Sequence, residues 1–431
     1  IGCIRPYMFA KYLTKFGHKV TVIRKGNING KPDDFYNSRI EGLEVISYLG
    51  ENCEAEMFEK GKLKINNLKQ SKTNKILDYI NNNSFLIKIK YFFSKPYSII
   101  KTILECQKEY KLLKKTINRL FKDGRTFDIV FSTYSGMSNI YAGKYVKKLF
   151  NCKWIMDFRD PIVRPGVEGW LFSLFFKPVQ NFAILKSDVC CSVSEDLSKC
   201  LSESIKNKKR VIALNNGYEP YTSIKNLKIE NKLIICYTGI FYPGRTLAAA
   251  TAVIKSISEL IKKNMIDSSK IKIVHAGPHA DLLKKVLGEY GLLNIFEDHG
   301  YVTRKEALNI QLNSDLFLLL SWNTKYEQGV LTGKFYEGIR ANKPILASVF
   351  GDVPNSELYR LNEKYNYGFC YETCKYDEEF DKMSDYIYNL YNQKINRGFI
   401  DYNPSPTLST DFYYETITRK LEKICLELTK L

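Results

Sequence analysis

The chain has 431 residues, of which 45% are hydrophobic and 13% aromatic, and this composition excludes a disordered chain. The length suggests two domains of roughly 200 residues each, and no apolar run reaches the roughly 18 residues that a membrane-spanning helix needs. The 65 Lys and Arg residues outnumber the 46 Asp and Glu residues, and the net charge of +19 favours polyanionic partners: nucleic acid, an anionic membrane surface or phosphorylated small molecules.

In the first half of the chain, apolar stretches predict short strands that alternate with helices. A helix at about 5–17 ends at Gly17, and strands follow at 18–24 and 43–48. The alternation returns with strands at 127–132, 153–157, 188–192 and 210–214 and helices at about 138–149, 169–186 and 195–201. Short apolar strands between helices indicate a parallel sheet that is covered on both faces.

Residues 55–125 interrupt this alternation with a Lys- and Asn-rich segment whose apolar residues have helical spacing. Residues 60–125 contain 17 Lys and Arg but 4 Asp and Glu, so +13 of the net charge lies here. One interpretation is a solvated helical face. The other is a basic amphipathic surface on an anionic membrane. Five apolar side chains would then lie beside the lysines: Phe92, Phe93, Tyr97, Ile99 and Leu104. Nucleic acid is a weaker alternative, because no recognition motif accompanies the charge.

The alternation of strands and helices restarts near Lys232. Strands are predicted at 233–239, 271–277, 295–300, 315–320, 344–349 and 367–371, and helices at about 246–263, 280–290, 303–313, 332–341, 376–393 and 409–430. We therefore predict an α/β protein with two doubly wound, Rossmann-like domains that are joined near 215–220. In such sheets ligands bind beyond the carboxyl ends of the strands, so the residues after each strand are the functional candidates.

The sequence LTGKFYEG follows one of these strands and opens a helix. Leu331, Thr332 and Gly333 would place backbone N–H groups at the helix N-terminus, where the macrodipole favours an anion. Lys334 lies in the first turn and would bind a diphosphate as a point charge. Glu337 lies on the same face, placed to accept hydrogen bonds from ribose hydroxyls. The alternative is an ordinary Lys–Glu pair on a helix.

A second candidate segment, TGIFYPGR, follows the first strand of the second half. Gly244 would permit the close approach of a ligand, and Arg245 would make a bidentate phosphate contact. We add Gly239, at the strand end, to the same set. Because these residues and Lys334 follow strands of one sheet, their combination favours a binding site over an isolated helix pair.

In the first half, the sequence DFRDP places Asp157 and Asp160 on either side of Arg159 at a strand end. In one interpretation the arginine neutralises both carboxylates in a structural turn. In the other, one of the two aspartates acts on an acceptor hydroxyl as a general base or orienting group. The aromatic segment 170–179 that follows is either a core helix or a membrane-docking face.

Cysteine and histidine patterns argue against disulfides and a metal centre. The 11 cysteines are scattered without a CxxC pair, so we expect reduced, mostly buried thiols in a cytosolic protein. His275 and His279 are four residues apart, but Gly277 and Pro278 between them disfavour the helix that would aim both at one metal. We expect that no metal and no other cofactor is required.

Four segments resemble the bacterial family 4-like glycosyltransferases of the GT-B fold, which build capsule, lipopolysaccharide and other surface polysaccharides. They are RPYMFAKYLTKFGHKVTVI near the start, WIMDFRDP mid-way, NNG at 215–217 and LTGKFYEGIRANKPILAS late in the chain. The resemblance implies two Rossmann-like domains that face a cleft, at 1–218 on the acceptor side and 219–400 on the nucleotide-sugar side, with 401–431 packing back on the first. It also implies that the first strand of the family is missing before Ile1 and that 55–125 is an insertion.

In that family, the matching positions imply that Lys334 and Arg245 hold the donor diphosphate and that Glu337 binds the nucleotide ribose. The base would stack near Tyr301 and Val302. One position departs from the pattern. Many retaining members carry two glutamates eight positions apart, but the position eight before Glu337 is Gly329, and Glu327 lies two residues earlier. The contacts to the donor sugar and the stereochemical outcome therefore stay open.

The resemblance implies transfer of a sugar from a nucleotide-diphosphate donor to a saccharide or lipid-linked saccharide. We expect the protein to act in the cytoplasm, peripherally at the inner face of the cell membrane, which the basic insertion and the 170–179 segment would contact. We expect no specific nucleic acid partner. Two alternatives remain: a sugar-nucleotide epimerase of the same fold, or a non-catalytic protein that binds polyanions or membranes through the insertion.

Overall fold

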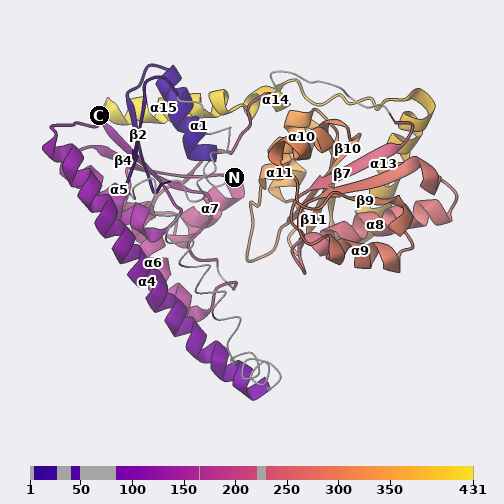
Figure 1. Ribbon diagram of the computed structural model, residues 1–431, viewed down its shortest axis with the longest axis horizontal. Helices are drawn as coiled ribbons and strands as arrows, with labels where there is room; N and C mark the ends of the chain where they lie inside the picture. Colours follow the sequence, from indigo (N-terminus) through magenta and orange to yellow (C-terminus); the bar gives the residue numbers. More distant parts are fainter. Residues whose placement is uncertain (1–3, 27–39, 49–83, 165, 221–229, 431) are drawn as a thin grey trace. The chain divides into compact units, whose positions relative to one another are not determined.

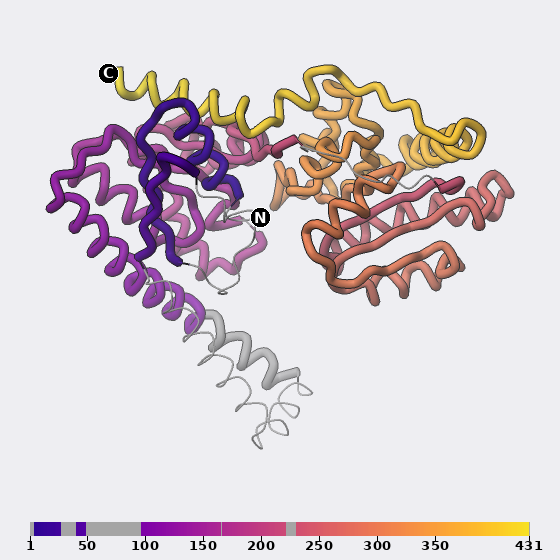
Figure 2. The backbone as a smooth tube through the Cα atoms, turned by 45° about the horizontal axis from the view of Figure 1, so that its top comes forward, coloured from indigo at the N-terminus to yellow at the C-terminus, as the bar shows by residue number. Residues whose placement is uncertain are grey.

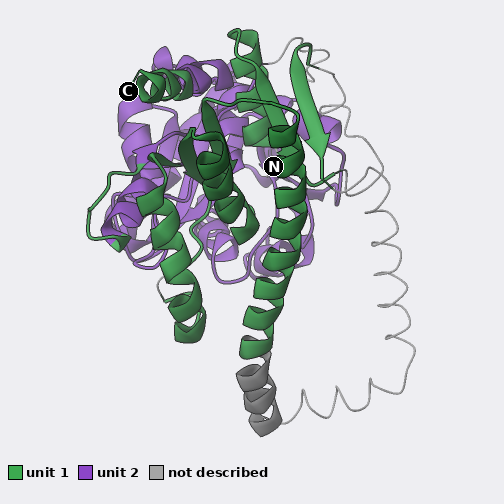
Figure 3. Cartoon of the chain, turned by 90° about the vertical axis from the view of Figure 1, so that its left-hand side faces the viewer, with its two compact units in different colours: residues 1–191, 204–211, 420–431 green, residues 192–203, 212–419 purple. Residues whose placement is uncertain are grey.

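The computed structural model describes residues 4–26, 40–48, 84–164, 166–220 and 230–430, with side chains of 84–95 excepted (Figure 1). The chain divides into two compact units (Figure 3). Unit 1 comprises residues 1–191, 204–211 and 420–431, and unit 2 comprises residues 192–203 and 212–419. Relative to the predicted boundary at 218, unit 2 takes two segments from the first half, and the predicted segment 401–431 is shared between the units.

Unit 1 is built from short parallel strands and covering helices. Its elements are α1 (Ile4–Lys15), β1 (Val20–Arg24), β2 (Leu43–Ser47), α4 (Ser84–Lys122), β3 (Ile129–Thr133), α5 (Met137–Phe150), β4 (Lys153–Phe158), α6 (Trp170–Lys186) and β5 (Val189–Ser192). The strand β1 pairs in parallel with β2, and β3 pairs in parallel with β4. The second sheet continues in the order β3-β4-β5-β6, where β6 is Ile212–Ala213 and follows α7 (Glu195–Ser204).

The described part of the predicted insertion includes the long helix α4. Its buried face carries Leu113 and Ile117, which pack with Ala142 of α5. Phe92 and Phe93, which the sequence placed beside the lysines, lie outside the described side chains. Residues 55–83 of the insertion also lie outside the described residues.

Unit 2 is a six-stranded parallel sheet with helices between its strands. Its elements are β7 (Leu233–Thr238), α8 (Thr246–Lys262), β8 (Ile271–Ala276), α9 (Ala280–Glu289), β9 (Phe296–Asp298), α10 (Arg304–Leu312), β10 (Leu316–Trp322), α11 (Gly333–Ala341), β11 (Ile345–Phe350), α12 (Glu357–Tyr365), β12 (Gly368–Glu372), α13 (Tyr376–Arg397) and α14 (Thr407–Asp411). The final helix is α15 (Tyr414–Thr429). The strand order is β12-β11-β10-β7-β8-β9, and every pair is parallel.

The two faces of this sheet bury separate apolar clusters, because successive residues of a strand point to opposite faces. In β10, Leu318 packs with the cluster that includes α8, α9 and α13, whereas the neighbouring Phe317 packs with the cluster of α11, α12 and α14. Such strands are apolar at nearly every position, as the sequence predicted for a sheet covered on both sides. The prediction of an α/β fold with Rossmann-like units is therefore confirmed.

Two elements differ from the prediction. The helix α12 was missed, although Ser356 caps it by accepting a hydrogen bond from the N–H of Tyr359, and Asn366 ends it in the left-handed region. The helix predicted at 409–430 is broken into α14 and α15. The break occurs because Tyr218 pairs with the backbone there: its N–H donates to the Phe412 carbonyl, and its carbonyl accepts from the N–H of Tyr414.

The end of α15 belongs to unit 1 and passes beside the first segment of the chain (Figure 2). His18 Nε2 lies 2.9 Å from Glu422 Oε1, and this contact joins the segment just before β1 to the helix. Residues far apart in the sequence thus complete one unit.

Candidate functional site

The centre of the unit 2 sheet has the geometry of a ligand-binding edge. The strands β7 and β10 are neighbours, and the chain winds outward from β7 to β8 and β9 on one side and from β10 to β11 and β12 on the other. Ligands in open parallel sheets bind at such a switch point, beyond the carboxyl ends of the strands. The predicted site residues Gly239 and Arg245 follow β7, and Lys334 and Glu337 open the helix after β10.

The loop after β7 lies against the loop after β8, and glycines make this possible. Gly277 has φ +150°, and a Cβ there would lie 2.1 Å from the Gly239 carbonyl oxygen. His275, which is fully buried, places Nε2 3.1 Å from the same oxygen and Nδ1 3.2 Å from Asp298 Oδ1. His275 therefore fixes the two loops and does not form a metal site with His279.

The first turn of α11 forms the second wall of the site. Thr332 occupies the N-cap position, but its side chain makes no capping hydrogen bond, and its buried Oγ1 lacks a partner among the described residues. The first N–H groups of a helix have no intrahelical acceptor. This helix start, predicted at Leu331–Gly333, therefore offers backbone donors and a hydroxyl to a ligand.

Lys334 and Glu337 form an ion pair within α11, with Lys334 Nζ 2.8 Å from Glu337 Oε2. Gln311 of α10 donates through Nε2 to the same Oε2 (2.8 Å) and to Thr238 Oγ1 (2.7 Å), so the carboxylate is held from two sides. Lys334 also reaches back over β7, since its Cε lies 3.2 Å from where a Cβ on Gly239 would be. The sequence missed Gln311, which carries no motif and joins the site only through the fold.

Arg245 begins α8 and is held by two partners. Its Nη2 lies 2.5 Å from Glu327 Oε2, and its guanidinium lies over the Trp322 ring at 4.9 Å from the centroid. Glu327 is nearly buried, while Arg245 keeps about a third of its side chain exposed at 35%. Glu327 therefore orients Arg245 and leaves part of it open to a ligand.

Gly329 has a structural reason to be glycine. Its φ is +71°, and a Cβ would lie 2.5 Å from both the Leu197 N–H nitrogen and Ser194 Oγ. Ser194 Oγ donates to the Gly329 carbonyl oxygen at 2.7 Å, so the start of α7 packs directly on this loop. A larger side chain at Gly329 would therefore require these neighbours to move.

Glu357 of α12 holds the first turn of α7 from the other side. Its buried carboxylate accepts hydrogen bonds from the N–H groups of Glu195 and Asp196, both at 2.9 Å. Burial raises the pKa of Glu357; the two N–H donors lower it and the carboxylates of Asp196 and Glu195 raise it, with a net pKa of about 7. Glu357 therefore titrates near neutrality.

This pKa predicts a pH-dependent stability. Because the pKa in the folded protein exceeds the ordinary value of 4.5, the folded state holds the extra proton, and stability falls as pH rises from about 4.5 to about 7. The loss amounts to at most about 3 kcal/mol. We expect Glu357→Gln to abolish this pH dependence. Between pH 5 and pH 8 the free energy of unfolding should therefore fall more for the wild type than for the variant. Urea unfolding of both proteins at the two pH values measures this change, and the same fall in both proteins would contradict the prediction.

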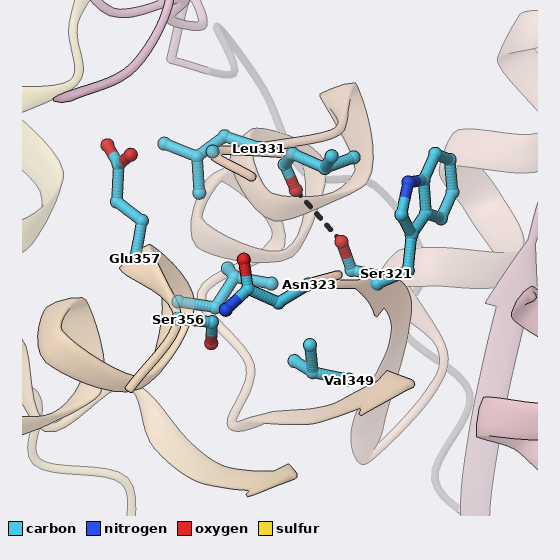
Figure 4. Close-up of a pocket in the computed structure, with 10 residues that line it drawn as sticks. Ser321, Asn323, Leu331, Val349, Ser356 and Glu357 are labelled. Atoms are coloured by element: carbon cyan, nitrogen blue, oxygen red, sulfur yellow. Dashed lines mark hydrogen bonds between the residues drawn. The ribbon is translucent and has the colours of Figure 1, made fainter. Parts of the chain in front are cut away.

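A small pocket lies beside Glu357 at the ends of β10 and β11 (Figure 4). It is lined by Ser321, Trp322, Asn323, Gly329, Val330, Leu331, Val349, Ser356, Glu357 and Leu358. Ser321 Oγ donates to the Val330 carbonyl oxygen at 2.8 Å and closes one side. Two buried atoms of the lining, Trp322 Nε1 and Asn323 Oδ1, have no hydrogen-bond partner among the described residues. Both atoms are enclosed by the surrounding residues.

The remaining predicted ligand contacts lie at the rim of the same sheet. Tyr301 follows β9 and is 91% exposed, and Val302 is half-buried. Gly244 has φ +75° and no atom near its hypothetical Cβ, so it leaves open space beside Arg245. These positions are accessible, as the predicted stacking of a base requires.

In unit 1, the two aspartates of DFRDP have different environments. Asp157 is fully buried: its carboxylate accepts from Arg5 Nη2 at 2.9 Å, Arg5 Nε at 3.1 Å and Thr133 Oγ1 at 3.0 Å. A carboxylate so enclosed is not accessible to an acceptor hydroxyl, which corrects the candidate role for Asp157. Asp160 is 77% exposed, and Arg159 pairs with it at 3.8 Å. The structural interpretation of the turn thus gains a second arginine, because the distant Arg5 pairs with the buried Asp157 while Arg159 pairs with Asp160.

The described residues show three features that concern metals, membranes and disulfides. These residues contain no cluster of three or more His, Cys, Asp or Glu that could hold a metal ion. Their helices include none that is long and apolar enough to cross a membrane. All nine cysteines in this part of the chain are free thiols. The expectation that no metal is required stays a prediction.

The parallel sheets and their helices define the class of the protein: the chain has the GT-B fold of two Rossmann-like units. Among solved structures, the lipopolysaccharide outer core galactosyltransferase WaaB in its apo form is 11% identical, with 76% of this chain and 81% of WaaB covered and a TM-score of 0.50. The α,α-trehalose 6-phosphate synthase of Burkholderia multivorans is 7% identical, with 75% of each chain covered and a TM-score of 0.50. No family model and no curated protein matches the sequence.

Proposed function

We propose that the protein is a glycosyltransferase that uses a nucleoside-diphosphate sugar as its donor. The observation that carries this proposal is the placement of Lys334, Glu337 and Arg245 after the neighbouring strands β7 and β10, at the switch point of the unit 2 sheet. Two cationic side chains and a helix N-terminus at one edge suit a diphosphate, and an adjacent carboxylate suits ribose hydroxyls.

This arrangement supplies the main electrostatic requirement of glycosyl transfer. The nucleoside-diphosphate leaving group gains negative charge as its bond to the sugar breaks. Lys334, Arg245 and the first N–H groups of α11 are fixed before the reaction and would stabilise that charge in the transition state. Thr332 Oγ1 would donate to a phosphate oxygen, and this contact would give it the partner that it lacks among the described residues. That no metal is needed for leaving-group stabilisation stays a prediction.

Gln311 and Glu327 act through their neighbours in this proposal. Gln311 holds Glu337 for the ribose, and Glu327 turns Arg245 toward the diphosphate.

The acceptor we propose is a saccharide or a lipid-linked saccharide in the synthesis of a surface polysaccharide, as in family 4-like enzymes. The four sequence segments quoted above support this, as does the fold shared with WaaB, whose name describes galactosyl transfer in the lipopolysaccharide outer core. Asp160 is the candidate to orient the acceptor hydroxyl, because its carboxylate is accessible whereas that of Asp157 is enclosed.

A nucleotide panel tests the donor site. Thermal unfolding is measured with UDP, GDP, CDP and ADP, and we expect one nucleotide to raise the melting temperature saturably. The corresponding nucleotide sugars are then screened for release of the diphosphate with and without saccharide acceptors. No shift with any of the four nucleotides would refute the proposal. Conversion of the sugar nucleotide to an isomer without an acceptor would favour the epimerase alternative.

A further inference from the structure

The solvent-facing side of α4 carries a stripe of residues with two distinct ends. Tyr97, Ile100 and Leu104 are spaced so that they share one helix face, and they are 69%, 56% and 59% exposed. The opposite face buries Ile99 and other core residues, so these three side chains contribute little to the core. Three large apolar side chains together on a solvated face mark an interaction surface.

Lysines continue the same face toward the end of α4. Lys101 lies between Ile100 and Leu104, Lys108, Lys111 and Lys115 follow at intervals of seven, three and four residues, and all four lysines are exposed. Residues 96–122 contain seven Lys and Arg against the two acidic residues Glu105 and Glu109. Glu105 pairs with Lys101 at 3.9 Å, and Glu109 accepts from Tyr48 and Ser138 at its less exposed position. The stripe is therefore apolar first and basic afterwards.

The helix α6, which contacts α4, adds a second apolar surface within unit 1. Trp170, Leu174 and Phe175 are 77%, 63% and 50% exposed, and Lys177 is exposed beside them. Trp170, Leu174 and Lys177 share one face of α6 by their spacing. Two neighbouring helices thus each combine exposed apolar side chains with lysine.

We propose that these residues of α4 and α6 form a binding surface for an anionic lipid bilayer. The apolar side chains enter the boundary between headgroups and acyl chains, and the lysines contact lipid phosphates. Charge complementarity selects an anionic surface, and the aliphatic side chains select a bilayer over nucleic acid. Ile100, Leu104 and Leu174 cannot bond to a phosphate backbone, but they gain free energy on leaving water.

This surface places the proposed transferase where a lipid-linked acceptor would be, at the inner face of the cell membrane. The lipid contact itself depends only on unit 1 residues, whereas the donor contacts depend on unit 2 residues. Vesicle binding with no response to nucleotides would leave the surface standing and refute the transfer reaction. A nucleotide response with no vesicle binding would support the donor site and refute the lipid-binding surface.

Vesicle co-sedimentation of the full chain tests the surface. The wild type is expected to bind vesicles of equal parts phosphatidylcholine and phosphatidylserine, and to bind vesicles of phosphatidylcholine alone far more weakly. Each lysine near an anionic surface contributes about fivefold in affinity, so Lys108→Gln/Lys111→Gln should weaken binding by about 25-fold. The double variant Ile100→Ser/Leu104→Ser should weaken it by at least about tenfold even at high salt.

Two control variants make similar substitutions in unit 2. One changes two exposed lysines, Lys262→Gln/Lys263→Gln, and the other changes an exposed aromatic residue, Phe399→Ser. Both controls should bind vesicles as the wild type does. Circular dichroism confirms that each variant is folded. The proposal is overturned if the wild type ignores anionic vesicles or if α4 variants and controls bind equally. The proposal is also overturned, in favour of nucleic acid, if single-stranded RNA displaces the protein from the vesicles and the Ile100→Ser/Leu104→Ser variant still binds vesicles as the wild type does.

Discussion

Replacement of Lys334 by Met is expected to weaken binding of the preferred nucleoside diphosphate by about 10- to 100-fold, because a charge-assisted contact to phosphate is lost. Turnover should fall further, by about 100- to 1,000-fold, since the missing charge stabilises the leaving group most strongly in the transition state. Met keeps most of the aliphatic stem that packs beside Gly239, and Gln311 still holds Glu337. Calorimetric titration and a diphosphate-release assay measure the two effects.

The appropriate control is Lys262→Met, an exposed lysine at the end of α8, which should behave as the wild type. A Lys334→Arg variant keeps the charge and should recover part of the affinity, although its planar group fits the position less well. If Lys334→Met binds the nucleotide as tightly as the control does, Lys334 and Glu337 are an ordinary helix pair and the donor site lies elsewhere.

The second large effect is expected on stability. Arg5→Met should lower the free energy of unfolding of unit 1 by about 3–5 kcal/mol, because it leaves the buried carboxylate of Asp157 without its charged partner. Arg5 and Asp157 are 2% and 0% exposed, and two hydrogen bonds join them. Urea unfolding followed by tryptophan fluorescence, to which Trp154 on the same strand as Asp157 contributes, measures the loss.

An exposed ion pair of the same unit provides the comparison. Arg125 pairs with Glu44, and both side chains are about 40% exposed. Arg125→Met should therefore cost less than about 1 kcal/mol. Equal losses for the two variants would contradict a structural role for the Arg5–Asp157 pair and would reopen a catalytic role for Asp157.

The sequence was most informative about the positions of strand ends. Apolar strands of the unit 2 sheet are easily recognised, so the residues after them could be assigned to one edge before the fold was known. Helical spacing likewise put Lys334 and Glu337 on one face, and the structure pairs them. Local periodicity is enough for such inferences, because they need only a strand direction or a helix register.

Pairings across the fold could not be predicted in this way. Arg5 reaches Asp157 across 152 positions, and nothing near DFRDP indicates that a distant arginine will bury one of its aspartates. Arg245 meets Glu327, and Gln311 meets Glu337, through packing of α8, α10 and α11 around the sheet. Gly329 is a further example. Glycine is needed there because the start of α7, which is far away in the sequence, leaves no room for a side chain.

The division of the chain has a consequence for synthesis and for engineering. The polypeptide passes from one unit to the other after Cys191, Glu203, Val211 and Arg419. Unit 1 therefore cannot complete its fold on the ribosome until residues 420–431 have emerged, long after its strands have been made. No single cut separates the two units, and a chimaera that exchanges unit 2 with a relative must exchange 192–203 and 212–419 together.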